Sequence, residues 1–162
     1  MAVALQRMLT SIVSLGLFSI CALTYGLFVM HQPLGEQAAQ ESRARSLMLT
    51  GACTLAAFIS HLALDLIGEG VNVCRGYRLQ APEALGRLVD ATATAPPALA
   101  WGVIGAVVLV TLAISLVPDD ARRARLNKLT AGVLFVSGAW LLFLAIGLHG
   151  LRSALIAAGS PL

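Results

Sequence analysis

The sequence predicts an all-α, polytopic integral membrane protein in which four transmembrane helices form one bundle. Two features of the composition carry this prediction: 58% of the 162 residues are hydrophobic and only 12% are charged. Soluble domains carry about 25% charged residues. A single core in a chain of this length could not hide so much apolar surface from water, so we expect part of it to face lipid. The length suits a single membrane domain that covers residues 1–162.

Four apolar runs are long enough to be membrane spans. The first has no charged residue over its length, and its 23 residues would cover roughly 34 Å at the helical rise, more than the hydrocarbon layer requires. Its length and the lack of an A-x-A-like site after it favour a retained helix over a cleaved signal peptide. Pro96-Pro97 and Asp119-Asp120 are helix-start signals for the third and fourth runs. The four predicted spans are residues 8–30, 46–68, 97–118 and 129–151.

Residues 70–95 are the sizeable segment that we expect outside the membrane. Within it, Leu85, Leu88 and Val89 fall on one face of a helix, whereas charged residues fall elsewhere. This pattern predicts a short amphipathic helix at about residues 82–89, which would lie on the headgroups between spans two and three.

The basic residues predict an orientation and a localisation. Five of them share the side of the termini: Arg7, Arg75, Arg78, Arg87 and Arg152. Six lie on the opposite side, in shorter loops close to the helix ends: Arg43, Arg45, Arg122, Arg123, Arg125 and Lys128. The positive-inside rule favours that second side as cytoplasmic, so we expect the termini on the non-cytoplasmic side of a bacterial inner membrane. Because these charges flank hydrophobic runs, we expect the lipid bilayer and not nucleic acid as their partner.

Ionisable residues inside the second and fourth spans are the candidate site. His61, Asp65 and Glu69 follow one another at four-residue spacing, which places them along one stripe of a helix, with Glu69 at the boundary. His149 and Arg152 lie near the exit of the fourth span, which crosses in the same direction as the second. Because a charge in lipid costs about 2.5–3.5 kcal/mol on insertion scales, we expect these groups to face protein or water. The sequence therefore predicts an intramembrane polar cluster of His61, Asp65, His149 and Arg152.

Three interpretations of this cluster stay open. Asp65 and Arg152 could form a structural ion pair that offsets the burial of both groups. Titratable His61 and Asp65 could instead pass protons or a small ion in series. His61 and His149 could also supply axial ligands to a haem b, which would make the chain a small membrane electron carrier. The first two need no cofactor, and the sequence does not indicate a metal.

Small residues at four-residue spacing predict faces for helix packing. They are Ala52, Ala56 and Ser60 in the second span, and Ala98, Gly102 and Ala106 in the third. No CxxC pair, HExxH motif or nucleotide-binding loop accompanies them, and Ser60 would not face His61 on a helix, so we do not expect an enzyme. We expect a small subunit or scaffold that packs with other membrane subunits, or a homo-oligomer. The alternative function is an oligomeric channel or transporter-like protein that uses His61 and Asp65.

Overall fold

The computed structural model describes residues 2–33, 41–76, 78–79 and 81–157. These residues form five helices and no strand: α1 (Ala2–His31), α3 (Ser42–Gly76), α4 (Glu83–Ala93), α5 (Pro97–Ser115) and α6 (Asp120–Ala157). The all-helical class that the sequence predicts is therefore confirmed.

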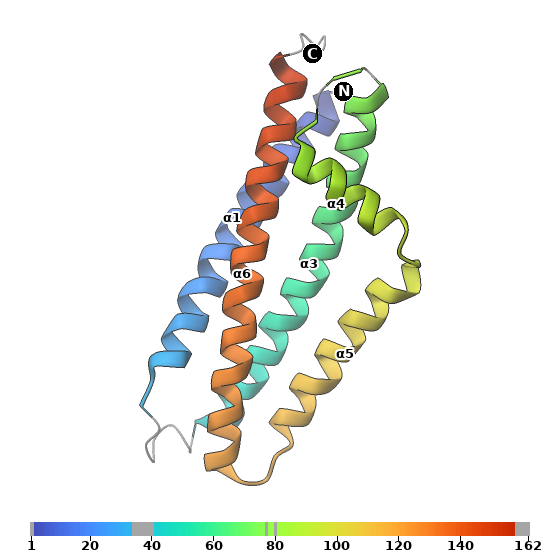
Figure 1. The fold of residues 1–162 in the computed structure, drawn as a ribbon. Coiled ribbons are helices and arrows are strands. Elements are labelled where there is room, and N and C mark those ends of the chain that lie inside the picture. The colour runs from blue at the N-terminus through green and yellow to red at the C-terminus, as the bar shows by residue number, and fades with distance from the viewer. Residues whose placement is uncertain (1, 34–40, 77, 80, 158–162) are drawn as a thin grey trace.

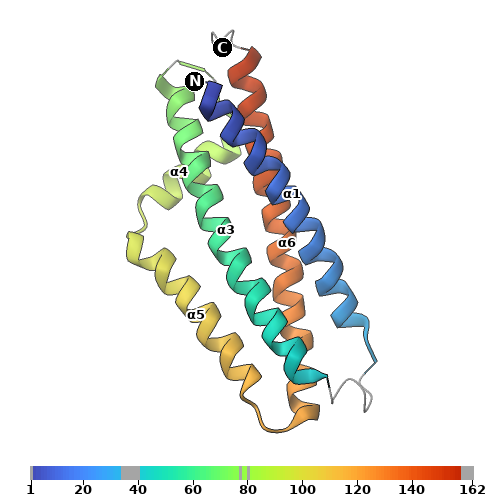
Figure 2. The same ribbon diagram turned by 180° about the vertical axis from the view of Figure 1, so that it is seen from behind.

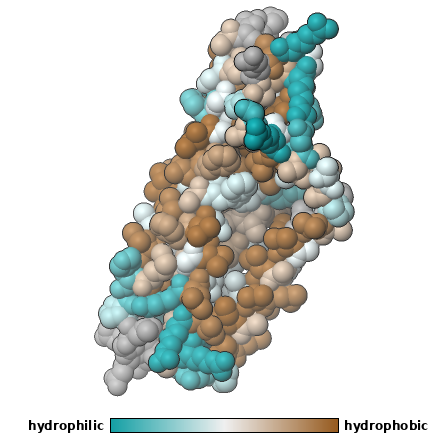
Figure 3. All heavy atoms as spheres, viewed as in Figure 1, coloured by the Kyte–Doolittle hydropathy of each residue, from teal (hydrophilic) through white to brown (hydrophobic). Residues whose placement is uncertain are grey.

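Three of the helices are long and apolar enough to cross a membrane. They are α1, over Gln6–His31, together with α3 and α6, and their most apolar windows have mean hydropathies of 2.1, 1.8 and 2.2. The third apolar run forms α5, which has 19 residues. The space-filling view shows hydrophobic side chains over the middle of the visible face and hydrophilic ones gathered toward its ends (Figure 3). This distribution is the one that a membrane-embedded helical protein needs.

Helices α1, α3 and α6 form the body of the molecule, and α5 lies beside α3 (Figures 1 and 2). The chain descends in α1, returns in α3, descends again through α4 and α5, and returns in α6, so that both termini lie at one end. Helix α4 crosses obliquely and leads into α5, which diverges from the body toward its first turn.

The closest helix pair is α1 with α6, and glycines allow this approach. A Cβ atom built on Gly26 would lie 2.8 Å from the carbonyl oxygen of Ala131. A Cβ atom on Gly138 would lie 3.1 Å from the carbonyl oxygen of Ser19, whose hydroxyl in turn donates a 2.7 Å hydrogen bond to the carbonyl of Gly138. Small residues that bring two backbones together, with a hydroxyl bond between them, are the usual basis of helix association in lipid.

Helices extend further than the apolar runs. Helix α3 continues past residue 68 to Gly76, so the first part of the predicted 70–95 loop is helical. Gly70 lies inside the helix, and Met8 and Leu151 pack over it: a Cβ atom there would lie 2.9 Å from Met8 Cε. Helix α4 occupies the region where the sequence predicted a short helix, and its buried residues are Leu85 and Val89. Helix α5 ends at Ser115, three residues before the predicted boundary at Pro118, in keeping with the bias of a proline against helix in the residue before it.

Candidate functional site

His61 and Asp65 lie together on the face of α3 that is turned toward α5. The His61 Nε2 and Asp65 Oδ2 atoms are 3.7 Å apart, as their four-residue spacing predicted. The His61 ring also meets the indole of Trp101 from α5 edge-on, with 5.5 Å between ring centroids and an interplanar angle of 73°. The histidine side chain is 27% exposed and the aspartate 63% exposed. The pair is therefore held between α3 and the start of α5, with the carboxylate at the outside.

The structure does not bring His149 and Arg152 to this pair. Leu151 packs against Gly70, which sets the register between α6 and α3: residue 151 lies beside residue 70, an offset of 81. His61 is then level with residue 142, and His149 lies seven residues, or about 10 Å, nearer the termini. By the same offset Arg152 is level with residue 71, six residues beyond Asp65. In the described part of the chain, no ion pair joins Asp65 to Arg152.

This register bears on the predictions made for the four residues. The pairing of Asp65 with Arg152 is replaced by the pairing of Asp65 with His61, and the Nε atom of Arg152 is buried without a hydrogen-bond partner among the described residues. Two axial haem ligands must reach one plane from both sides. The separation of about 10 Å along the bundle and the exposure of His149 disfavour that arrangement for His61 and His149. Glu69 is exposed on the stripe one turn beyond Asp65.

The two predicted small-residue faces have different environments. On α3, Ala56 is fully buried and Ala52 packs against the core, while the Ser60 hydroxyl donates to the carbonyl of Ala56 in its own helix. On α5, the three residues of the predicted face are exposed: Ala98, Gly102 and Ala106. A Cβ atom built on Gly102 would meet no atom within 4 Å. Helix α5 instead turns Thr111 and Ser115 inward, at 6% and 4% exposure.

A second polar cluster, at the opposite end of the bundle, was not predicted from the sequence. Asn127 Nδ2 of α6 donates a 2.8 Å hydrogen bond to the carbonyl of Ser42, and Arg123 Nε donates at 3.2 Å to the hydroxyl of the same serine. Arg123 is only 4% exposed and also pairs with Asp120. In the sequence these residues belong to a basic run that resembles a solvated helix start. The four-residue spacing of Arg123 and Asn127, which places both on one face, is the signal that could have revealed the cluster.

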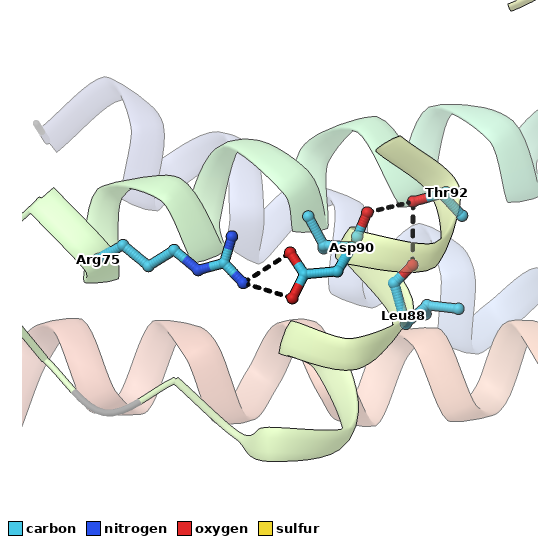
Figure 4. Close-up of polar contacts among 5 residues, drawn as sticks. Arg75, Leu88, Asp90 and Thr92 are labelled. Atoms are coloured by element: carbon cyan, nitrogen blue, oxygen red, sulfur yellow. Dashed lines mark hydrogen bonds and ion pairs between the residues drawn. The ribbon is translucent and has the colours of Figure 1, made fainter. Parts of the chain in front are cut away.

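Helix α4 is attached to the body by packing and by one ion pair. Leu85 is 2% exposed, and it fills the space above Gly147 of α6, where a Cβ atom would lie 2.8 Å from Leu85 Cδ2. Arg75 Nη2 at the end of α3 lies 2.8 and 3.0 Å from the two carboxylate oxygens of Asp90 (Figure 4). Together these contacts hold α4 across α3 and α6, close to the end that carries the termini.

An open groove of about 460 Å³ lies between the first part of α1 and α3. Polar side chains line it on one side and leucines on the other: Gln6, Arg7, Thr10 and Ser11 from α1, and Leu62 and Leu66 from α3. Among the residues that the structure describes, no group of three or more histidine, cysteine, aspartate or glutamate side chains is placed to hold a metal ion.

The chain was compared with protein families, curated proteins and solved structures. No family model, no curated protein and no solved structure matches the chain.

Proposed function

We propose that this chain is a four-span integral membrane protein without enzymatic activity, a small subunit or scaffold that assembles with other membrane subunits through α5. It resides in a bacterial inner membrane, with both termini on the non-cytoplasmic side. The observation that carries the proposal is the outward face of α5, whose small residues Ala98, Gly102 and Ala106 are exposed in the described part of the chain.

The dimensions of α5 support its role as a membrane span in addition to α1, α3 and α6. Its 19 residues cover about 28 Å, close to the roughly 30 Å of hydrocarbon in a bilayer. Trp101 near its start is 56% exposed, as an anchor at the lipid–water interface would be. With Trp101 at that interface, its contact with His61 supports a distance of 19 residues, again about 28 Å, between the interface and the first residue of α3, Ser42.

This placement assigns the surplus length of the longer helices to the non-cytoplasmic side. The 35 residues of α3 and the 38 of α6 correspond to about 52 and 57 Å, well beyond one hydrocarbon layer. The polar residues beyond His61 on α3, and His149 and Arg152 on α6, then lie at or above the headgroups. Helix α4 lies at the same level, with Leu85 and Val89 against the body and its charged residues toward water.

Helix α5 has the properties of an assembly surface. It contacts chiefly α3, and the inward residues Thr111 and Ser115 leave the small-residue face on the outside. Helices in lipid associate where small residues let backbones approach. At Gly102 a second helix could approach closely, because a Cβ atom there meets nothing within 4 Å. The partner is either another membrane subunit or a second copy of the chain.

Substitution of Gly102 tests the proposal. Gly102→Leu is expected to release the protein from its complex while the chain keeps its own fold, because a Cβ atom at this position meets no atom of the described residues within 4 Å. Gly51→Leu is the matched control, since Gly51 is also exposed with nothing within 4 Å but lies on α3. The measurement is the size of the protein on native gels after mild detergent extraction from its own membrane. If the unsubstituted protein emerges as a monomer, or if both variants behave alike, the proposal is wrong.

The second candidate function, passage of protons or a small ion, is favoured by the pairing of His61 with Asp65. A histidine 3.7 Å from a carboxylate has the geometry to hand on a proton. Asp65→Asn should then abolish proton flux in liposomes that contain the purified protein, whereas Glu69→Gln, one turn further out, should reduce it less. Flux that persists in Asp65→Asn would exclude this function.

A further inference from the structure

A small pocket with both apolar lining (Val29, Pro33 and Ala124) and polar lining is present at the end of the bundle opposite the termini. At that end α1 finishes near the starts of α3 and α6 (Figure 1). The polar lining of the pocket consists of Gln32, which follows α1, Arg45 of α3, and Asn127 and Lys128 of α6. The space inside is about 10 Å³. A single water-sized group needs about this much.

Two of the residues that line this pocket have a buried amide oxygen without a hydrogen-bond donor in the described part of the chain: Gln32 Oε1 and Asn127 Oδ1. Asn127 is 2% exposed, and the orientation of its amide is fixed because Nδ2 donates to the carbonyl of Ser42. Its oxygen is therefore an acceptor that requires a donor. One compact group with several N–H or O–H bonds could donate to both oxygens in a space this small.

The end of α1 adds to the preference for a positively charged donor. Helix α1 ends at His31, directly before Gln32. The last carbonyl groups of a helix lack partners within the helix and carry the negative end of its dipole. The inside of the pocket thus favours a cation no larger than a primary ammonium group. A trimethylammonium group is several times too large and has no N–H to donate.

The positively charged residues that line the pocket favour an anionic ligand group. Arg45 and Lys128 also line it, and the Arg45 guanidinium is held by a 2.9 Å ion pair with Glu41. Guanidinium and ammonium groups are the usual partners of phosphate oxygens. A ligand that satisfies both sets of groups is a zwitterion, with an ammonium group that enters the pocket and a phosphate that stays outside.

We propose that this pocket binds the headgroup of a phospholipid with a primary ammonium group, the phosphoethanolamine class. The ammonium donates to Gln32 Oε1 and Asn127 Oδ1, and the phosphate lies against Arg45 and Lys128. The level of the pocket fits this ligand, because the apolar run of the first span ends at residue 30 and that of the fourth begins at residue 129. Headgroups lie at that depth.

Lipid binding by the purified full-length protein tests the proposal. Native mass spectrometry would compare phosphatidylethanolamine, phosphatidylcholine and phosphatidylglycerol with the same acyl chains. We expect phosphatidylethanolamine to bind on the order of tenfold more tightly than the other two, the effect of one charge-assisted hydrogen bond. Equal binding of phosphatidylethanolamine and phosphatidylcholine would overturn the proposal, because the pocket would then hold only water. Tightest binding of phosphatidylglycerol would also overturn it, because the site would be a basic patch without selection for ammonium.

Three variants separate the contributions of the groups. Gln32→Leu removes one of the two acceptors and leaves the bond of Asn127 to Ser42 intact, so the preference for phosphatidylethanolamine over phosphatidylcholine should fall, while Asn127 Oδ1 still accepts from the ammonium. Lys128→Gln should weaken all three lipids alike. Arg122→Gln is the control at the same end of the bundle, since Arg122 is exposed and does not line the pocket.

A further variant covers the case in which Gln32→Leu does not fold. Gln32→Glu has almost the same shape and adds a negative charge at the same position, so it should increase the preference for phosphatidylethanolamine. An unchanged preference in folded Gln32→Leu, or in Gln32→Glu, would contradict the assignment of the ammonium to this residue.

Discussion

The contact between α1 and α6 can be tested at a single atom. Replacement of Gly26 by alanine adds one Cβ atom, which would lie 2.8 Å from the carbonyl oxygen of Ala131 and 3.1 Å from both the Cβ and the backbone nitrogen of Phe135. None of these atoms can rotate away, because they belong to the backbone of α6 or are fixed to it. The two helices must therefore separate locally to accept the substitution.

The magnitude follows from a comparison within α1. Any glycine-to-alanine change in a helix interior favours the helix by roughly 1 kcal/mol, and this contribution is common to Gly16 and Gly26. A Cβ atom at Gly16 meets no atom within 4 Å. Overpacking of a tight contact costs about 1–3 kcal/mol. We therefore expect Gly26→Ala to be less stable than Gly16→Ala by about that amount, although both variants gain the same methyl group.

The assay is unfolding of the purified protein in detergent micelles, followed by circular dichroism as sodium dodecyl sulfate is added. The free energies of unfolding of the two variants are compared with each other as well as with the unsubstituted protein. Gly138→Ala, on the facing helix, should behave like Gly26→Ala, since its Cβ atom would lie 3.0 Å from Leu23 Cγ. Equal stability of Gly16→Ala and Gly26→Ala would refute the reasoning that glycines set the distance between α1 and α6.

Three further expectations concern the two ends of the bundle. Leu85→Ala should release α4 from α6, at a cost of about 2–5 kcal/mol for a buried leucine, and hydrogen exchange should rise across α4. Arg87→Ala is the control: Arg87 forms an exposed pair with Glu83, so its loss should leave exchange unchanged. Arg123→Ala should lower the free energy of unfolding by about 1–3 kcal/mol through loss of the bonds from Arg123 to Ser42 and Asp120. Arg122 is exposed, so Arg122→Ala should change that free energy by less than about 0.5 kcal/mol. Cys74, which is fully buried, should resist N-ethylmaleimide until the protein is unfolded, and labelling of Cys74 in the folded protein would contradict the packing of α3 at that end.

The apolar runs of the sequence predicted the helical class and the cores of the helices, but not their ends. Hydropathy marks where lipid must begin and end, and a helix has no reason to stop there, because Glu69 and Asn72 are tolerated in a helix that continues into water. Helix α3 accordingly runs to Gly76. A contact in this part of α3, Met8 and Leu151 over Gly70, joins three segments far apart in the sequence. Local pattern cannot reveal such a contact.

The candidate site was predictable where it depends on one helix. The spacing of His61 and Asp65 is a property of α3, and the two groups do lie within 3.7 Å. The predicted partnership with His149 and Arg152 depended on the relative depths of two helices, which were counted from the starts of the apolar runs. The packing of Leu151 on Gly70 gives an offset of 81 residues in place of the 83 counted from Ser46 and Leu129, so His149 lies seven residues beyond the level of His61 and not five. The buried cluster of Ser42, Arg123 and Asn127 was missed for the converse reason, since it exists only where two helix starts meet.

The elements of this chain are held with unequal strength, and the difference bears on how it would assemble. Helices α1 and α6 meet backbone to backbone, α3 is tied to α6 by buried hydrogen bonds at its start, and α4 is fastened by Leu85 and by the pair of Arg75 with Asp90. Among the described residues, helix α5 makes no side-chain hydrogen bond or ion pair to another helix, and its inward hydroxyls are satisfied within α5 itself, since Thr111 donates to the carbonyl of Val107 and Ser115 to that of Leu112. An incoming helix that displaced α5 would therefore break no such bond to the body, but it would disturb the packing of Trp101 on His61.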